Sequence, residues 1–219
     1  MAKESISKPW DWAEIPSTDW TDVSDEFYPV AHRWKSHSKT KALDLGCGRG
    51  RHTLFLAELG FSVTAVDLSP DGINQLKLEA QRRGLEHRIE TFVCDMLDLS
   101  LPDKSFDCVL GFHSIYHTTY ADLRALIDRV TRILDDSGGL YVTFNSKDSP
   151  SFRHPSNQIL DEHTVVKTTG IEAGIPHTYL DHKDIRALLV DYRIKKLQQI
   201  GDYYDDGMSI HFFVEAEKK

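Results

Sequence analysis

The sequence predicts an α/β fold in which a doubly wound, mostly parallel sheet of seven strands carries helices on both faces. Two observations predict this fold. Short apolar segments alternate with amphipathic segments along residues 41–144, and glycine-rich or acidic residues follow the apolar segments. A parallel pair of strands needs a long crossover connection, usually a helix, and such crossovers are right-handed. The alternation therefore favours successive strand–helix–strand units.

Residues 1–40 predict an N-terminal arm and a helix that cover the sheet. All four tryptophans lie in this segment, which favours an arm packed on the body of the protein. Apolar residues recur at helical spacing over residues 24–37, which predicts an amphipathic helix. Pro29 fits only in the first turns of that helix.

Residues 41–144 predict the core of the sheet and three helices. Strands are expected at 42–45, 62–66, 89–94, 106–112 and 140–144, and helices at 51–59, 70–83 and 120–134. Ser69 is a good N-cap, and Pro70 occupies the first helical position, where its missing N–H costs nothing. Gly84 then ends this helix.

The alternation breaks after residue 145 and resumes near residue 181. The intervening residues hold prolines and polar side chains, and an irregular segment of this length is typically functional or a lid. A helix capped by Asp181 is expected over 181–190, followed by an antiparallel hairpin at 194–201 and 210–216. The predicted single domain, residues 1–219, thus comprises an arm and helix cover (1–40), a cofactor-binding core (41–144), an insert or lid (145–180) and a C-terminal helix and hairpin (181–219).

Composition excludes several classes of partner. The formal net charge is −8, and no basic cluster large enough for a nucleic-acid surface is present. No apolar run reaches the roughly 18 residues of a membrane span. Cys47, Cys94 and Cys108 are too widely spaced for a metal motif and suit a reducing compartment. We therefore expect a cytoplasmic monomer or homodimer without nucleic-acid or membrane partners.

The glycine loop after the first strand indicates which kind of ligand is bound. Gly46, Gly48 and Gly50 have the spacing GxGxG, whereas the dinucleotide fingerprint GxGxxG would place a glycine at Arg51. The loop is preceded by Asp44. A pyrophosphate favours helix-terminal amides without a nearby anion. S-adenosylmethionine instead carries an ammonium and a sulfonium and no phosphate, so an adjacent carboxylate suits it.

Acidic residues also follow the second and third strands. A carboxylate at Asp67 can accept both ribose hydroxyls, and Asp95 can accept the adenine amino group. Apolar Leu68, Met96 and Leu97 are expected to sandwich the base. Acids at the ends of successive strands, beside the glycine loop, favour a cofactor that has a ribose and an adenine.

These segments resemble the successive motifs of the class I S-adenosylmethionine-dependent methyltransferases. The resemblance is carried by residues 43–50, 66–69, 94–96, 105–109 and 135–142. It is strong over 41–144 and closest to the small-molecule branch, such as the tellurite-resistance-type and quinone-biosynthesis-type enzymes. The resemblance implies a Rossmann-like methyltransferase fold with strand order 3-2-1-4-5-7-6 and an antiparallel last strand.

The resemblance also implies which residues bind the methyl donor, whose product is S-adenosylhomocysteine. Gly46 and Gly48 are expected beside the methionine moiety, Asp67 beside the ribose, and Asp95 with the Met96 backbone beside the adenine. In related enzymes an N-terminal helix covers the cofactor, which places Arg33 near the methionine carboxylate. The full predicted cofactor set is Asp44, Gly46, Cys47, Gly48, Gly50, Asp67, Leu68, Cys94, Asp95, Met96, Phe112, His113 and Arg33.

The loop after the fourth strand supplies the predicted catalytic residues. His113 and His117 are candidate general bases, and Tyr116 is a candidate for orienting the acceptor. A structural histidine whose backbone contacts the cofactor is an equally weighted interpretation of His113. The run from His113 to Tyr116 departs from the Asn/Asp-Pro-Pro-aromatic motif of DNA amino-methyltransferases, which argues against a nucleobase acceptor.

The insert adds further histidines. His154, His163 and His177 lack the close spacing of a zinc motif, so no metal site is expected. As a group they are expected to contribute one pocket residue, and the segment 174–179 is the best candidate because it returns the chain to the sheet.

The predicted reaction is in-line transfer of a methyl group from S-adenosylmethionine to a small-molecule acceptor. The leaving group is a neutral thioether, so the protein needs mainly to align the reactants and exclude water. A base is needed only for an acceptor that holds a proton at its attacking atom. Two alternatives remain open: an NAD(P)-dependent oxidoreductase of Rossmann type, and a non-catalytic S-adenosylmethionine-binding module.

Overall fold

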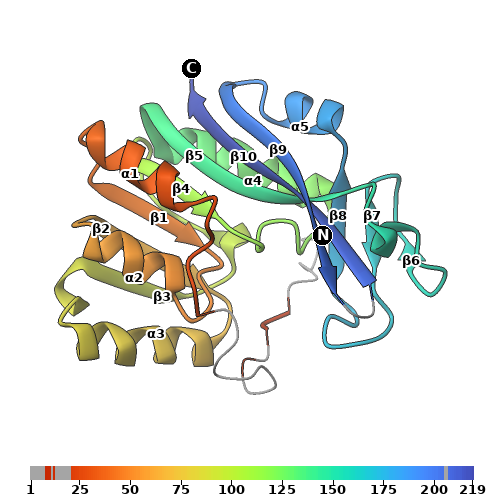
Figure 1. Ribbon diagram of the computed structural model, residues 1–219, viewed down its shortest axis with the longest axis horizontal. Helices are drawn as coiled ribbons and strands as arrows, with labels where there is room; N and C mark the ends of the chain where they lie inside the picture. The colour runs from red at the N-terminus through yellow and green to blue at the C-terminus, as the bar shows by residue number, and fades with distance from the viewer. Residues whose placement is uncertain (1–7, 11, 13–20, 205–206) are drawn as a thin grey trace.

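The computed structural model describes residues 8–10, 12, 21–204 and 207–219. Most of the predicted N-terminal arm and the first two residues of the expected hairpin turn lie outside this described part. Figure 1 shows a twisted central sheet between two layers of helices, with the C-terminal hairpin beside β5. Among the described residues, no helix is both long and apolar enough to cross a membrane.

In the described part of the chain, ten strands form the sheet. They are β1 (Lys41–Leu45), β2 (Ser62–Asp67), β3 (Ile89–Val93), β4 (Phe106–Gly111), β5 (Leu134–Ser146), β6 (Gln158–Ile159), β7 (Thr164–Val166), β8 (Pro176–Leu180), β9 (Tyr192–Tyr204) and β10 (Gly207–Lys218). Strands β3-β2-β1-β4-β5 are parallel neighbours, and β10 then pairs antiparallel with both β5 and β9. This part of the sheet confirms the predicted order 3-2-1-4-5-7-6, in which β10 is the predicted seventh strand and β9 the predicted sixth.

The insert adds three short strands to the seven that were predicted. Strand β8 pairs in parallel with the carboxyl end of β5 through Asn145 and Ser146, and β7 and β6 follow as antiparallel neighbours. Strands β6, β7 and β8 have 2, 3 and 5 residues, respectively. Strands this short lack the period-two alternation that reveals a half-buried strand. The insert therefore extends the sheet at the edge where a ligand site is expected.

Five α-helices of the described residues cover the sheet. They are α1 (Tyr28–Ser36), α2 (Arg51–Glu58), α3 (Pro70–Arg83), α4 (Tyr120–Ile133) and α5 (His182–Leu188). Ser69 caps α3 as predicted, with its hydroxyl accepting from the Gly72 amide. Asp181 and Asp184 form a capping box at the start of α5. These local bonds satisfy backbone donors that a helix start leaves without intrahelical partners.

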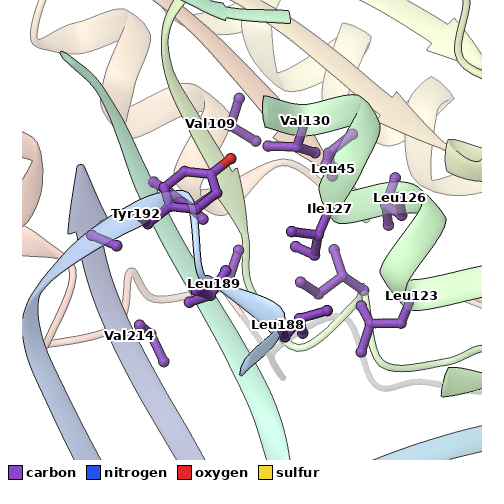
Figure 2. Close-up of a cluster of buried hydrophobic side chains, with 14 of the residues drawn as sticks. Leu45, Val109, Leu123, Leu126, Ile127, Val130, Leu188, Leu189, Tyr192 and Val214 are labelled. Atoms are coloured by element: carbon purple, nitrogen blue, oxygen red, sulfur yellow. The ribbon is translucent and has the colours of Figure 1, made fainter. Parts of the chain in front are cut away.

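Side chains on the two faces of the sheet enter separate cores. On one face, Leu43 and Leu45 pack with apolar residues of α4 and α5, and Figure 2 shows this cluster with Leu123, Leu126, Ile127 and Val130 projecting from α4. On the other face, Ala42 and Cys108 pack with α1 and α2. Alternate residues of a strand point to opposite faces, so burial of both sets fixes the register of the sheet.

Candidate active site

One pocket lies at the carboxyl ends of β1, β2 and β4 and encloses about 1180 Å³, its open mouth included. Ligands of open α/β sheets bind at this edge, where neighbouring connections leave on opposite faces. The predicted cofactor and catalytic residues, Arg33 excepted, all line it: Asp44, Gly46, Cys47, Gly48, Gly50, Asp67, Leu68, Cys94, Asp95, Met96, Phe112, His113, Tyr116 and His117. The tertiary structure thus brings together residues from four strand ends.

The glycine loop adopts backbone angles that favour glycine. Gly46, Gly48 and Gly50 have φ values of 68°, 56° and 83°, in the left-handed region that other residues enter only with strain. A Cβ on Gly46 would lie 2.4 Å from the Cβ of Ser114, whose hydroxyl donates to the Leu45 carbonyl. The loop backbone therefore passes too close to the β4 loop for any side chain.

Asp67 holds this loop in place. One of its carboxylate oxygens accepts from the Gly48 amide at 2.7 Å, and the other accepts from the Ser69 amide at 2.8 Å. Burial raises the pKa of Asp67, while these amide hydrogen bonds oppose the shift. Each oxygen has a second lone pair, so the same carboxylate can anchor the loop and accept ribose hydroxyls.

Asp44 is a buried acid beside the loop. Its side chain accepts a hydrogen bond of 2.6 Å from the Thr53 hydroxyl. Burial raises its pKa to about 7, because desolvation disfavours the charged form more than the Thr53 bond favours it. A cationic ligand would restore the ionised form. The carboxylates around the glycine loop therefore fit a cofactor that carries an ammonium and a sulfonium.

Asp95 lies at the third strand end, next to apolar lining residues. Its carboxylate caps a short 3-10 helix, Met96–Asp98, by accepting from the Leu97 amide at 2.9 Å. Leu68 and Met96 line the same part of the pocket. Polar recognition beside apolar walls is what an adenine needs, since its edge forms hydrogen bonds and its faces stack.

The described part of the N-terminal arm closes over the glycine loop. A Cβ on Gly48 would lie 2.4 Å from the Trp12 ring, and the Arg49 guanidinium lies 5.0 Å from the centre of that ring. Arg49 also donates to the Trp12 carbonyl at 2.8 Å. Trp10 stacks on His117 with ring centres 5.9 Å apart. The early tryptophans predicted a packed arm, but the sequence did not assign Trp10 or Trp12 to the pocket.

His113 lines the pocket in the loop after β4, next to Tyr116. Its φ is 49°, and its amide donates to the Thr143 hydroxyl at 2.7 Å. Its Nδ1 lies 3.1 Å from the Tyr116 hydroxyl, which lies 3.4 Å from His211 Nε2. Burial lowers the pKa of His113 well below its ordinary value. A lowered pKa leaves the ring neutral but makes it a weak base, and the backbone is strained, so His113 suits a positioning role better than proton abstraction.

The insert contributes Glu172 and Ile175 to the pocket wall. Glu172 Oε1 lies 3.4 Å from His117 Nε2 and 3.1 Å from His177 Nε2. Burial lowers the pKa of His117, although the contact with Glu172 opposes this shift. Residues 174–179 thus place His177 beside the pocket residues His117 and Glu172. No sequence pattern singled out Glu172, because acidic residues are common in loops.

Other predicted residues lie elsewhere. The prediction for Arg33 was wrong: its guanidinium makes a two-point pair with Glu215 on β10, at 3.0 and 2.5 Å, and does not line the pocket. Helix α1 covers the face of the sheet rather than its carboxyl edge, so Arg33 cannot approach a ligand there. His163 stacks on Tyr120, and the exposed His154 contacts Ser156.

Comparisons with known proteins show the family of this chain. Residues 42–138 match the methyltransferase domain family. The ubiquinone biosynthesis O-methyltransferase of Bradyrhizobium sp. (strain ORS 278) is 30% identical over 190 residues, which cover 83% of this chain and 72% of that protein. The glycine/sarcosine/dimethylglycine N-methyltransferase of Actinopolyspora halophila is 34% identical over 125 residues, or 56% of this chain and 22% of the relative.

A solved structure shows the same fold. The S-adenosylmethionine-dependent methyltransferase of Methanosarcina mazei superposes with a TM-score of 0.74 at 22% identity, covering 90% of this chain and 98% of that one. The chain spans less than half the length of several curated relatives. The domain match and the long alignment to the O-methyltransferase nevertheless show that this chain belongs to the S-adenosylmethionine-dependent methyltransferases.

Proposed function

We propose that this protein transfers the methyl group of S-adenosylmethionine to a small-molecule acceptor. The observation that carries the proposal is one continuous pocket with two chemically distinct halves. The half at the glycine loop holds Asp44, Asp67 and Asp95, and the other half holds Tyr116 and His117. The first half matches a cationic nucleoside cofactor, and the second offers aromatic and imidazole groups to an acceptor.

Each cofactor residue has a proposed role. Asp44 stabilises the cationic amino-acid end, Asp67 accepts the ribose hydroxyls, and Asp95 accepts the adenine amino group. When bound, the cofactor supplies a methyl group on a positively charged sulfur and leaves as a neutral thioether. Gly46 and Gly48 allow the loop backbone to approach that cofactor closely, because any Cβ there would meet Ser114 or Trp12.

The chain's own contribution to the reaction is alignment and exclusion of water. Trp10 and Trp12 cover the pocket from the N-terminal arm. Tyr116 is buried, and its contacts with His113 and His211 fix the position of its hydroxyl. We assign His113, Tyr116 and His117 to binding and orienting the acceptor at the methyl group.

The relatives support a small acceptor, since they are named as N- and O-methyltransferases of glycine derivatives and of ubiquinone biosynthesis. The net charge of −8 supports the absence of a nucleic-acid partner. Cys47, Cys94 and Cys108 are all free thiols, which suits the cytoplasm. We further propose a monomer or a homodimer, which light scattering during gel filtration would measure.

Calorimetric titration with S-adenosylhomocysteine and with NAD tests the cofactor. We expect S-adenosylhomocysteine to bind and NAD not to bind, and the reverse result would overturn the proposal. A panel of small thiols, phenols, amines and oxyanions then tests the reaction through release of S-adenosylhomocysteine from S-adenosylmethionine. Cofactor binding without release by any acceptor would favour the non-catalytic binding module.

A further inference from the structure

Three side chains with metal-binding groups converge at the acceptor half of the pocket. His117 lies in the loop after β4, Glu172 in the turn before β8, and His177 on β8. Their nearest ligand atoms all lie within 4.8 Å of one another. Both imidazole Nε2 atoms approach the same carboxylate oxygen, Glu172 Oε1, at 3.4 and 3.1 Å. The two histidine nitrogens therefore converge on a single atom, Glu172 Oε1.

The hydrogen bonding of His177 leaves its Nε2 directed at Glu172. His177 Nδ1 lies 2.9 Å from the Ile175 carbonyl oxygen, which only accepts, so Nδ1 carries the proton. Nε2, the other ring nitrogen, faces Glu172 Oε1 across 3.1 Å. Among the described residues, this Nε2 has no hydrogen-bond partner, although the side chain is only 1% exposed. A buried nitrogen without a hydrogen-bond partner, directed at a carboxylate oxygen, is a position that a metal ion can fill.

The geometry points to a binding site for a divalent transition-metal ion, held by His117 Nε2, Glu172 Oε1 and His177 Nε2. Zinc bonds of about 2.0–2.2 Å to nitrogen and oxygen separate tetrahedral ligands by about 3.4 Å. The observed 3.1 and 3.4 Å contacts match that separation. Two imidazoles and one carboxylate favour Zn²⁺ and its neighbours over Mg²⁺ or Ca²⁺, which take oxygen ligands.

Surrounding groups hold the three ligands in position. The Ile175 carbonyl fixes the tautomer and ring orientation of His177, as outer partners of metal-binding histidines commonly do. Lys167 contacts the other oxygen of Glu172, which leaves Oε1 for a single bond to the ion. The Thr178 amide donates to the Tyr116 carbonyl at 2.9 Å, so the β4 loop is joined to β8 beside His177.

Three protein ligands leave the fourth tetrahedral position open. His117 and Glu172 line the pocket, so that position faces the space assigned to the acceptor. This last step rests on the proposed function and makes the acceptor a molecule with an oxygen or sulfur donor that binds the metal. A bound metal ion would lower the pKa of its oxygen or sulfur ligand, so the acceptor would lose its proton to solvent on binding. The ionised atom would then take the methyl group as the carbon–sulfur bond of the methyl donor breaks and the neutral thioether leaves, without requiring His113 as a base.

Zinc titration of the full chain tests the site independently of catalysis. The native chain without a polyhistidine tag, freed of metal by a chelator, is titrated calorimetrically with Zn²⁺. We expect one ion per chain. Glu172→Gln and His177→Ala should each weaken binding at least about tenfold. Because the chain has 11 histidines, His154→Ala is the matched control and should bind Zn²⁺ like the native chain. Tetrahedral Co²⁺ bands in the visible spectrum should appear in the native chain and be lost in Glu172→Gln.

Binding of S-adenosylhomocysteine by each variant reports whether the cofactor half remains folded. Zinc affinity that is absent from the native chain, or unchanged in both ligand variants, would overturn the metal site. Zinc binding without any binding of S-adenosylhomocysteine would instead refute the proposed function and leave the metal site standing. If these side chains form only an imidazolium–carboxylate pair, the first of these results will be observed, because the native chain will bind no zinc at this site.

Discussion

The carboxylate of Asp67 accepts a hydrogen bond from the Gly48 amide across 2.7 Å. This bond joins the end of β2 to the glycine loop that follows β1. A charged acceptor makes such a bond stronger than a neutral pair. The residue proposed to bind the ribose therefore also shapes the loop proposed to hold the rest of the cofactor, and both effects depend on one side chain.

Asp67→Ala should weaken binding of S-adenosylhomocysteine by about 2 kcal/mol, which is about 30-fold in Kd. The loss combines missing ribose contacts with a freed Gly48 amide. Isothermal titration calorimetry measures it. Asp71→Ala, at an exposed position in the first turn of α3, is the control and should leave Kd unchanged. An unchanged Kd for Asp67→Ala would contradict the ribose assignment.

Asp44→Asn should stabilise the cofactor-free protein while weakening cofactor binding. The pKa of Asp44 is about 7 in the folded chain and 3.8 without perturbation. The folded state therefore binds the proton more tightly, and its stability is lost as pH rises between these values. Asparagine removes this penalty, so the gain in Tm over the native chain should be larger near pH 8 than near pH 5.

The same titration governs cofactor affinity in the native chain. A cationic ligand favours ionised Asp44, so binding should weaken as pH falls below about 7. Asp44→Asn should flatten this part of the pH profile, because asparagine does not titrate. Calorimetric titration across that range checks the prediction, and parallel profiles for the two proteins would show that another group is responsible.

Gly46→Ala should destabilise the protein more than Gly84→Ala, although the two glycines share nearly the same φ, 68° and 69°. An alanine in the left-handed region costs about 1–2 kcal/mol at either site. At Gly46 the new Cβ would also lie 2.4 Å from the Ser114 Cβ, whereas at Gly84 nothing lies within 4 Å. Overpacking adds about 1–3 kcal/mol.

Chemical denaturation measures the free energy of unfolding for both glycine variants. Both variants carry nearly the same backbone strain, so the difference between their losses of unfolding free energy measures the close approach of the glycine loop to the β4 loop. Equal losses at the two positions would show that the loop can move away from Ser114 without cost.

Trp12→Ala should accelerate dissociation of S-adenosylhomocysteine without abolishing binding. The Trp12 ring covers Gly48 and stacks against Arg49, so its removal uncovers the pocket while leaving the acidic residues in place. Stopped-flow displacement measures the rate. Tyr203→Ala removes an aromatic side chain that is 82% exposed on β9 and is the control. Equal dissociation rates for both variants would exclude a covering role for Trp12.

The core of the fold was predictable because its causes are local. Strand β1 and helix α3 follow the expected boundaries closely, since apolar runs, the Ser69 cap and Gly84 act within a few residues. The cofactor half of the site follows from the same information. Parallel strands bring their carboxyl ends to one edge, so Asp44, Asp67 and Asp95 meet wherever the strand order places β1, β2 and β3 side by side.

The acceptor half depended on tertiary contacts that no local pattern encodes. The sequence placed His117 in a loop and predicted no metal site, because His154, His163 and His177 lack the close spacing of a zinc motif. No local pattern brought His117, Glu172 and His177 together. Their convergence follows from the pairing of β8 with β5 and from the bonds between Thr178 and the β4 loop. Arg33 failed for the same reason, since Glu215 reaches it only through the pairing of β10 with β5.

The sequence by itself determined the strand–helix alternation, the glycine loop and the three acids, and its resemblance to the methyltransferases implied the sheet order. Together these indicated the methyl donor. Only the tertiary structure decided which side chains face the acceptor and which aromatic residues cover the pocket. The physical reason is the range of the interactions. Caps, turns and strand periodicity are set by neighbouring residues, whereas a pocket wall is set by the packing of segments far apart in the chain.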